Sequence, residues 1–180
     1  MTPDAHRESF ALNPIGHIES GYHTFGEVPH PRGKGGWNED VSTIALYPEH
    51  AGEISGLEGY SHIIVLFWIH KSSEWKMPEH TPHHDSHDPH QHHHSHKPPH
   101  VKVFATRMPV RPNPIGLSVV ELMDFSPDSG RVAVKGLDAL NGTPIIDIKP
   151  YIPNFDSYPE ASLPEWVGRH LREHQHSNGE

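Results

Sequence analysis

YSHIIVLFWIH (Tyr60–His70) is the most apolar stretch of the chain. β-Branched and aromatic residues dominate it, and these residue types favour extended strands. Its longest uninterrupted apolar run, Ile63–Ile69, has seven residues, whereas about 20 are needed to cross a bilayer as a helix. The stretch therefore predicts a buried strand, and neither a long helix nor a membrane span.

Similar strand signals recur along the whole chain, each bounded by Gly, Pro, Asn or Asp. They are Ile15–Ser20, Ser42–Tyr47, Val101–Arg107, Ile115–Phe125, Gly130–Leu140 and Thr143–Ile152. PDSG (Pro127–Gly130) predicts a hairpin turn. Pro48 and Gly56 bound one or two helical turns, and Leu163–His174 predicts the one sizeable helix. About seven short strands with little helix predict a mainly β protein, an antiparallel sheet or barrel.

Composition limits the function classes. At 180 residues with 33% hydrophobic residues, the chain is long enough for one domain with a core. It has no cysteine, which excludes disulfides, thiolate metal sites and a Cys nucleophile. Its N-terminus, MTPDAHRESF, has no apolar signal core, so we expect a cytoplasmic protein. The formal net charge of -9 argues against binding nucleic acid by bulk electrostatics, so such a role would need a local basic patch or protonated histidines.

A polar window, Glu79–His100, contains ten of the twenty histidines. Without apolar residues to bury, it predicts a disordered loop. Imidazole suits nickel and zinc, and the candidate ligands are His83, His84, His87, His90, His92, His93, His94 and His96. A low-specificity metal-buffering loop and a solvated insertion that binds metal only in vitro are both compatible with this composition.

The tetrapeptide NPIG occurs twice, at Asn13–Gly16 and Asn113–Gly116. Pro fixes its own φ and pushes the preceding residue to extended geometry, so Asn-Pro favours entry into a strand. The residues after the two copies share little, whereas a duplication would carry similarity over a 20–50-residue unit. We interpret the repeat as one turn chemistry used twice.

Three strand patterns are interrupted by polar residues that could form a site. His70 and Lys71 end the most apolar strand, where they could equally mark its exit into solvent. Arg107 and Arg111 lie on a Pro-stiffened segment and could hold a carboxylate or phosphate, or form a surface charge pair. Asp138 and Asp147 each lie between apolar residues, so each needs a hydrogen-bonding or cationic partner, from turn amides or from a ligand.

These stretches together resemble the TsaA-like family of S-adenosylmethionine-dependent tRNA methyltransferases, the TrmO type. The resemblance rests on five motifs: NPIGHIES, PRG, GLEGYSHIIVLFWIHK, VFATRMPVRPNPIGLSVVEL and VKGLDALNGTPIIDIKPYIP. It implies a small single-sheet antiparallel β-barrel over residues 10–155, with the histidine loop (79–100) inserted and a C-terminal extension at 156–180. It also implies a homodimer. The implied reaction is methyl transfer from S-adenosyl-L-methionine to N6-threonylcarbamoyladenosine next to the tRNA anticodon.

The resemblance also implies which residues form the site. The cofactor-binding positions would be Pro31, Arg32, Gly33, His70, Lys71, Arg107, Leu117, Asp138, Ala139, Leu140 and Asn141. His70 and Asp138 are the candidate catalytic residues. A tRNA enzyme should have a basic rim, for which Arg32, Lys34, Arg107, Arg111 and Lys149 are the candidates. The alternative is a protein that binds the cofactor in a regulatory or metal-handling role, without tRNA methylation.

Overall fold

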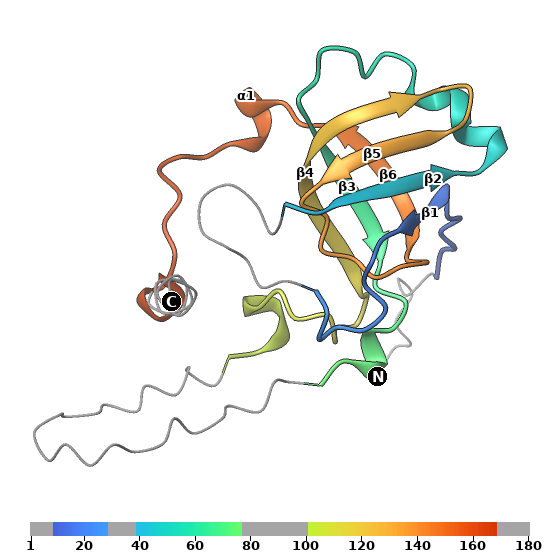
Figure 1. Cartoon of the computed structure of the whole chain (residues 1–180). Helices are drawn as coiled ribbons and strands as arrows, with labels where there is room; N and C mark the ends of the chain where they lie inside the picture. Colours follow the sequence, from blue (N-terminus) through green and yellow to red (C-terminus); the bar gives the residue numbers. More distant parts are fainter. Residues whose placement is uncertain (1–8, 29–38, 77–100, 169–180) are drawn as a thin grey trace, which may run out of the picture.

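In the computed structural model, which describes residues 9–28, 39–76 and 101–168, six antiparallel strands close into one barrel (Figure 1). The strands are β1 (Gly16–Glu19), β2 (Val41–Leu46), β3 (His62–Trp68), β4 (Ile115–Ser126), β5 (Arg131–Lys135) and β6 (Pro144–Pro150). Their order around the barrel is β1-β2-β5-β4-β3-β6. The predicted mainly β fold, a single antiparallel barrel, is confirmed.

Along β2, β3 and β5, every second residue points into the barrel interior. On β3, Ile63, Val65 and Phe67 are buried, while the residues between them face outward and are half-buried. Val132 and Val134 of β5 are fully buried in the same core. Because each such side chain contributes roughly 1.5–3 kcal/mol when removed from water, the period-two pattern sets the register of the strands.

Two strand predictions were wrong in part or in whole. Val101–Arg107 is not a strand: it contains the 3-10 helix η3 (Val103–Ala105), whose turn is closed by the Thr106 hydroxyl and amide on the Val103 carbonyl. The six strands close the barrel without this segment, so its backbone has no free strand edge in the barrel to pair with. The Gly130–Leu140 strand is shorter than predicted, because Gly136, with φ of 89°, turns the chain after Lys135.

The predicted turns are confirmed. Pro48–Ile54 forms the 3-10 helix η1. PDSG closes the β4–β5 hairpin, with the Gly130 amide donating to the Ser126 carbonyl at 2.9 Å. The remaining short helices are η2 (Ser72–Glu74) and α1 (Pro153–Asp156).

The C-terminal helix predicted at 163–174 is helical at residues 165–168. Its remainder, the histidine window and residues 31–34 lie outside the described residues. In the part of the chain that the structure describes, no helix is both long and apolar enough to span a membrane.

The glycines of the two NPIG copies each allow a close approach, but to different neighbours. A Cβ on Gly16 would lie 2.4 Å from the Ala45 carbonyl oxygen, on the backbone of β2. A Cβ on Gly116 would lie 2.1 Å from the ring of Phe67, which faces it on β3. The shared tetrapeptide therefore opens β1 and β4 with a residue that lets a neighbouring group pack onto the backbone.

Candidate functional site

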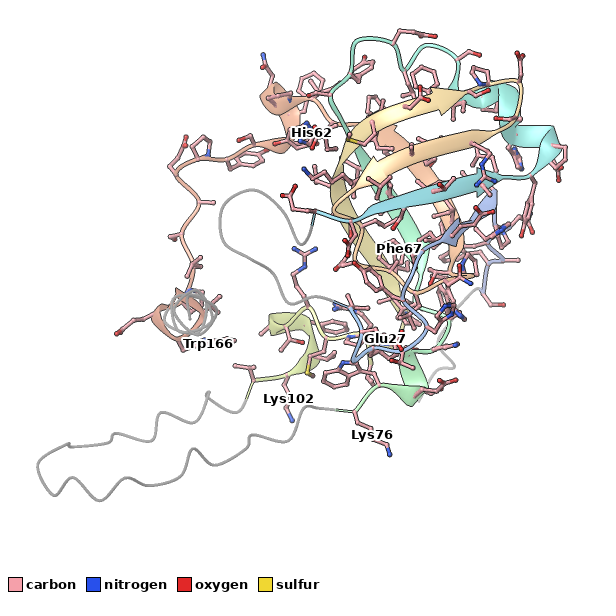
Figure 2. The ribbon with its side chains drawn as sticks, viewed as in Figure 1. Glu27, His62, Phe67, Lys76, Lys102 and Trp166 are labelled. Carbon is pink, nitrogen blue, oxygen red and sulfur yellow. The ribbon has the colours of Figure 1, made fainter. Side chains whose placement is uncertain are left out.

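A cavity of about 630 Å³ opens at one end of the barrel. Antiparallel strands alternate in direction, so the end of β3, the start of β4, the turn after β5 and the start of β6 meet there (Figure 1). Residues from the 25–28 segment, from 67–75 and from 104–117 complete its wall. In Figure 2, Phe67 and Glu27 lie toward this end, while His62 at the start of β3 lies at the opposite end.

Most of the predicted cofactor-binding residues gather at this cavity. Those that line it are His70, Lys71, Arg107, Leu117, Asp138, Ala139 and Leu140. They come from three segments that are far apart in the sequence. Pro31, Arg32 and Gly33 lie outside the described residues.

Asn141 helps to hold the cavity wall in place. Its side-chain oxygen accepts a hydrogen bond from the Ser20 amide at 3.2 Å, and its own amide donates to the Tyr22 carbonyl at 2.7 Å. The Ser20 hydroxyl donates to the Ala139 carbonyl at 3.0 Å. The 138–141 turn is therefore attached to the chain after β1, which keeps its position rigid relative to the barrel.

Asp138 is a carboxylate largely removed from water, and its partner is Ser118. The Ser118 hydroxyl, 3% exposed and pointing inward from β4, donates a hydrogen bond to Asp138 Oδ1. Burial raises the pKa of the Asp138 carboxyl, while the Ser118 hydrogen bond and the Arg107 charge oppose that rise. Ser118 was not among the predicted site residues, although its inward place between Gly116 and Val120 marks it as a polar group in need of a partner.

His70 is held by a second buried hydroxyl. Thr143, 2% exposed and immediately before β6, places its Oγ1 3.2 Å from His70 Nδ1. Burial lowers the pKa of the His70 imidazole, the neighbouring Lys71 charge lowers it further, and Glu74 partly opposes them. The imidazole is therefore mainly neutral at pH 7 and can accept a proton there. Thr143 was also not predicted.

Arg107 and Arg111, in the Pro-rich 101–113 segment, hydrogen-bond to backbone carbonyls in and next to that segment. Arg107 donates to the Leu117 carbonyl at 2.9 Å, which ties the 101–113 segment to the start of β4. Arg111 donates to the carbonyls of Thr106 and Met108, at 3.2 and 3.4 Å. Both arginines line the cavity, so they bring cationic groups to its wall while stabilising the loop.

Lys149 and Asp147, by contrast, pair with each other at 2.6 Å. Neither is among the residues that line the cavity. Lys149 therefore does not contribute to a basic rim there, and the Asp147 carboxylate has a cationic partner, as its sequence context required. Within the described residues, no group of three or more His, Asp or Glu side chains is arranged to hold a metal ion. The predicted histidine ligands lie outside those residues.

Comparison with known proteins identifies the family. Residues 17–157 match the family described as tRNA-methyltransferase O N-terminal domain. The chain belongs to this family. The resemblance inferred from the five motifs is thereby confirmed.

Individual relatives agree with the family assignment. An S-adenosyl-L-methionine-binding protein of Archaeoglobus fulgidus is 38% identical over 145 residues, which cover 81% of this chain and 91% of that protein. A tRNA (adenine(37)-N6)-methyltransferase of Escherichia coli K12 is 36% identical over 159 residues, covering 86% of this chain and 63% of that protein. A crystal structure of TrmO from Pseudomonas aeruginosa matches with a TM-score of 0.63 at 31% identity, covering 86% of this chain and 62% of that chain.

This chain is shorter than several family members. It spans 63% of the Escherichia coli enzyme and 62% of the Pseudomonas aeruginosa chain. It spans only 37% of another Archaeoglobus fulgidus relative, a probable S-adenosyl-L-methionine-binding protein that is 39% identical. Residues 17–157, which match the family, include every residue that lines the cavity.

Proposed function

We propose that this protein is an S-adenosylmethionine-dependent tRNA (adenine-N6) methyltransferase whose cofactor binds in the cavity at the barrel end. The observation that carries the proposal is the meeting of seven predicted cofactor-binding residues in one cavity. Its volume of about 630 Å³ lies within the usual range of small-molecule sites, roughly 300–1,000 Å³. The names of the relatives supply the reaction class.

The chemistry of the cavity fits the proposed cofactor. The Arg107 guanidinium suits the carboxylate of the methionine part, and the 138–141 turn offers backbone groups and a carboxylate to the adenosine part. Leu117 and Leu140 supply apolar surface, as most small-molecule sites do. When bound, the cofactor supplies a methyl group attached to a sulfonium sulfur. A nitrogen nucleophile can attack the carbon of this methyl group.

The amide-like nitrogen of the substrate must lose a proton during methyl transfer. His70 and Asp138 are the candidate groups that accept this proton. Each side chain has its orientation restricted by a buried hydroxyl, from Thr143 and Ser118 respectively. The Thr143 contact engages Nδ1, so we assign Nε2 of the neutral ring to the substrate. Because a methyl transfer needs its reacting atoms in line, positioning of this kind supplies much of the rate enhancement.

The proposed substrate is N6-threonylcarbamoyladenosine next to the anticodon of tRNA, which would place the protein in the cytoplasm. The charge distribution near the cavity supports an RNA substrate. The segments 69–76 and 101–113, which flank the cavity, contain five cationic residues and one acidic residue, Glu74; the cations are Lys71, Lys76, Lys102, Arg107 and Arg111. The whole chain has a net charge of -9, so this basic patch runs against the overall charge.

We also propose that the protein works as a homodimer through the outer face of β4. Ile115, Leu117 and Val119 alternate along that face and are 42–46% exposed, which makes an apolar stripe suited to a second copy. Ile115 and Leu117 also line the cavity, so a second copy on this stripe would border the cofactor site. Val119→Lys should convert the dimer to a monomer in sedimentation analysis. Val41→Lys, at an exposed apolar position on β2, is the matched control and should leave the sedimentation unchanged.

Arginine variants test the cofactor assignment. Arg107→Ala should weaken cofactor binding by about 1.5–3 kcal/mol, because it removes a charge-assisted hydrogen bond, which is roughly a 10- to 150-fold rise in Kd. The control is Arg131→Ala, whose guanidinium pairs with Glu19 at 2.5 Å on the barrel surface. Isothermal calorimetry measures both. Equal affinity of the Arg107 variant and the wild type would remove Arg107 from the cofactor site.

A further inference from the structure

Phe104 is an aromatic side chain left in solvent at the mouth of the cavity. It lies on the 3-10 helix η3 and is 78% exposed, yet it lines the cavity. The other lining aromatics, Phe25, Phe67 and Trp75, are buried or half-buried. Leaving a Phe exposed forgoes the favourable burial of a large apolar surface, so a ligand that covered Phe104 at the cavity mouth would gain that burial.

The surroundings of Phe104 indicate what that ligand is. Lys102 is two residues away, and Lys71, Arg107 and Arg111 line the same cavity. Figure 2 shows Lys76 and Lys102 at this end of the molecule, with their side chains directed away from the barrel. An exposed aromatic ring within a basic patch is the combination that binds unpaired nucleotides, where the ring stacks on a base and the cations attract the phosphates.

We propose that Phe104 is a stacking platform for an unpaired nucleobase of the RNA substrate as it enters the cavity. The inference rests on the proposed function and extends it by naming the side chain that recognises the base. Stacking occupies the face of a purine and leaves its edge free, so the exocyclic nitrogen can still reach His70 and Asp138.

The test compares Phe104 variants in binding an anticodon stem-loop RNA that contains N6-threonylcarbamoyladenosine. Phe104→Ala should raise the Kd for this RNA by about 5- to 150-fold, as stacked bases do when their aromatic partner is removed. The cofactor Kd should change much less than the RNA Kd, because Phe104 lines only the exposed mouth of the cavity. Phe104→Trp should bind as the wild type does, whereas Phe104→Leu, which is apolar but cannot stack, should resemble the alanine variant.

Phe155→Ala is the matched control, because Phe155 is 71% exposed on α1 and does not line the cavity. It should leave RNA binding unchanged. If the wild type transfers the methyl group and Phe104→Ala binds RNA equally well, the stacking inference is overturned while the proposed function stands. If wild-type protein binds RNA through Phe104 but transfers no methyl group, the inference stands and the function fails. A Phe104→Ala protein that changes from dimer to monomer would make Phe104 a subunit contact and also overturn the inference.

Discussion

The two NPIG glycines should differ sharply when each is replaced by alanine. Neither has a positive φ, so the added methyl group alone decides the outcome. At Gly16 the methyl carbon would meet the Ala45 oxygen at 2.4 Å and the Leu46 Cα at 2.8 Å, where ordinary contact begins at 3.4 Å. Both are backbone atoms, so β1 and β2 must separate by about 1 Å. We expect a loss of about 3 kcal/mol or more in unfolding free energy, at the upper end of overpacking costs.

Gly116→Ala should cost less stability and more function. Its methyl carbon meets the Phe67 ring at 2.1–2.7 Å, and a ring can rotate away where a backbone cannot. We expect a cost of roughly 1–3 kcal/mol. Because Phe67 and Gly116 both line the cavity, the displaced ring should also weaken cofactor binding. Gly16 does not line the cavity, so its variant should bind the cofactor normally whenever it is folded.

The unfolding free energies are measured by urea denaturation. The cofactor is left out, because a bound ligand would add stability. In thermal unfolding the Gly16 variant should lose about 6–12 °C, at roughly 2–4 °C per kcal/mol for a domain of this size. Gly52→Ala is the control: its added methyl group meets nothing within 4 Å, so stability should hold or rise. A Gly16→Ala protein whose unfolding free energy stays within about 0.5 kcal/mol of the wild type, the spread of neutral surface changes, would contradict the predicted clash between β1 and β2.

The titratable groups of the cavity give further predictions. Because burial raises the folded pKa of Asp138, its contribution to stability is present below the unfolded pKa and is lost as pH rises through the folded pKa. Asp138→Asn should therefore gain stability relative to the wild type as pH rises from about 4 to 7, while it loses activity. Urea denaturation at several pH values measures this. A difference in unfolding free energy between the two proteins that stays constant over this pH range would contradict the prediction. Lys71→Gln should raise the pKa of His70 toward its ordinary value, because the Lys71 charge lowers it. The NMR titration of the His70 ring measures this, and an unchanged midpoint would exclude the Lys71 effect.

Much of the fold could be predicted from the sequence, because a barrel interior takes every second residue. At Arg131–Lys135 the apolar residues Val132 and Val134 face the interior, as that rule requires. In the first half of β4 the apolar Ile115, Leu117 and Val119 face outward instead, so there the alternation predicted a strand but not which face is buried. The same rule failed at Val101–Arg107. There the pattern is equally regular, but the barrel closes with other strands, and closure depends on all six strands together. No local window contains that information.

The titratable residues of the candidate site could be predicted from the sequence, but the hydroxyl groups that hydrogen-bond to them could not. His70 and Asp138 interrupt apolar patterns, so their need for partners could be seen in the sequence. Ser118 and Thr143 supply those partners, yet each lies at least 20 residues away in the chain. Their pairing depends on which strands become neighbours. The metal binding predicted for the histidine window stays a prediction, testable by nickel or zinc calorimetry with and without residues 80–100.

The most direct test of the account is methyl transfer itself. The protein is incubated with labelled S-adenosylmethionine and with tRNA from a strain that lacks the methylated base, and the digested nucleosides are separated. The account predicts label in N6-threonylcarbamoyladenosine, with strongly reduced transfer by Arg107→Ala and normal transfer by Arg131→Ala. Wild-type protein that binds the cofactor but leaves this tRNA unlabelled would contradict the account.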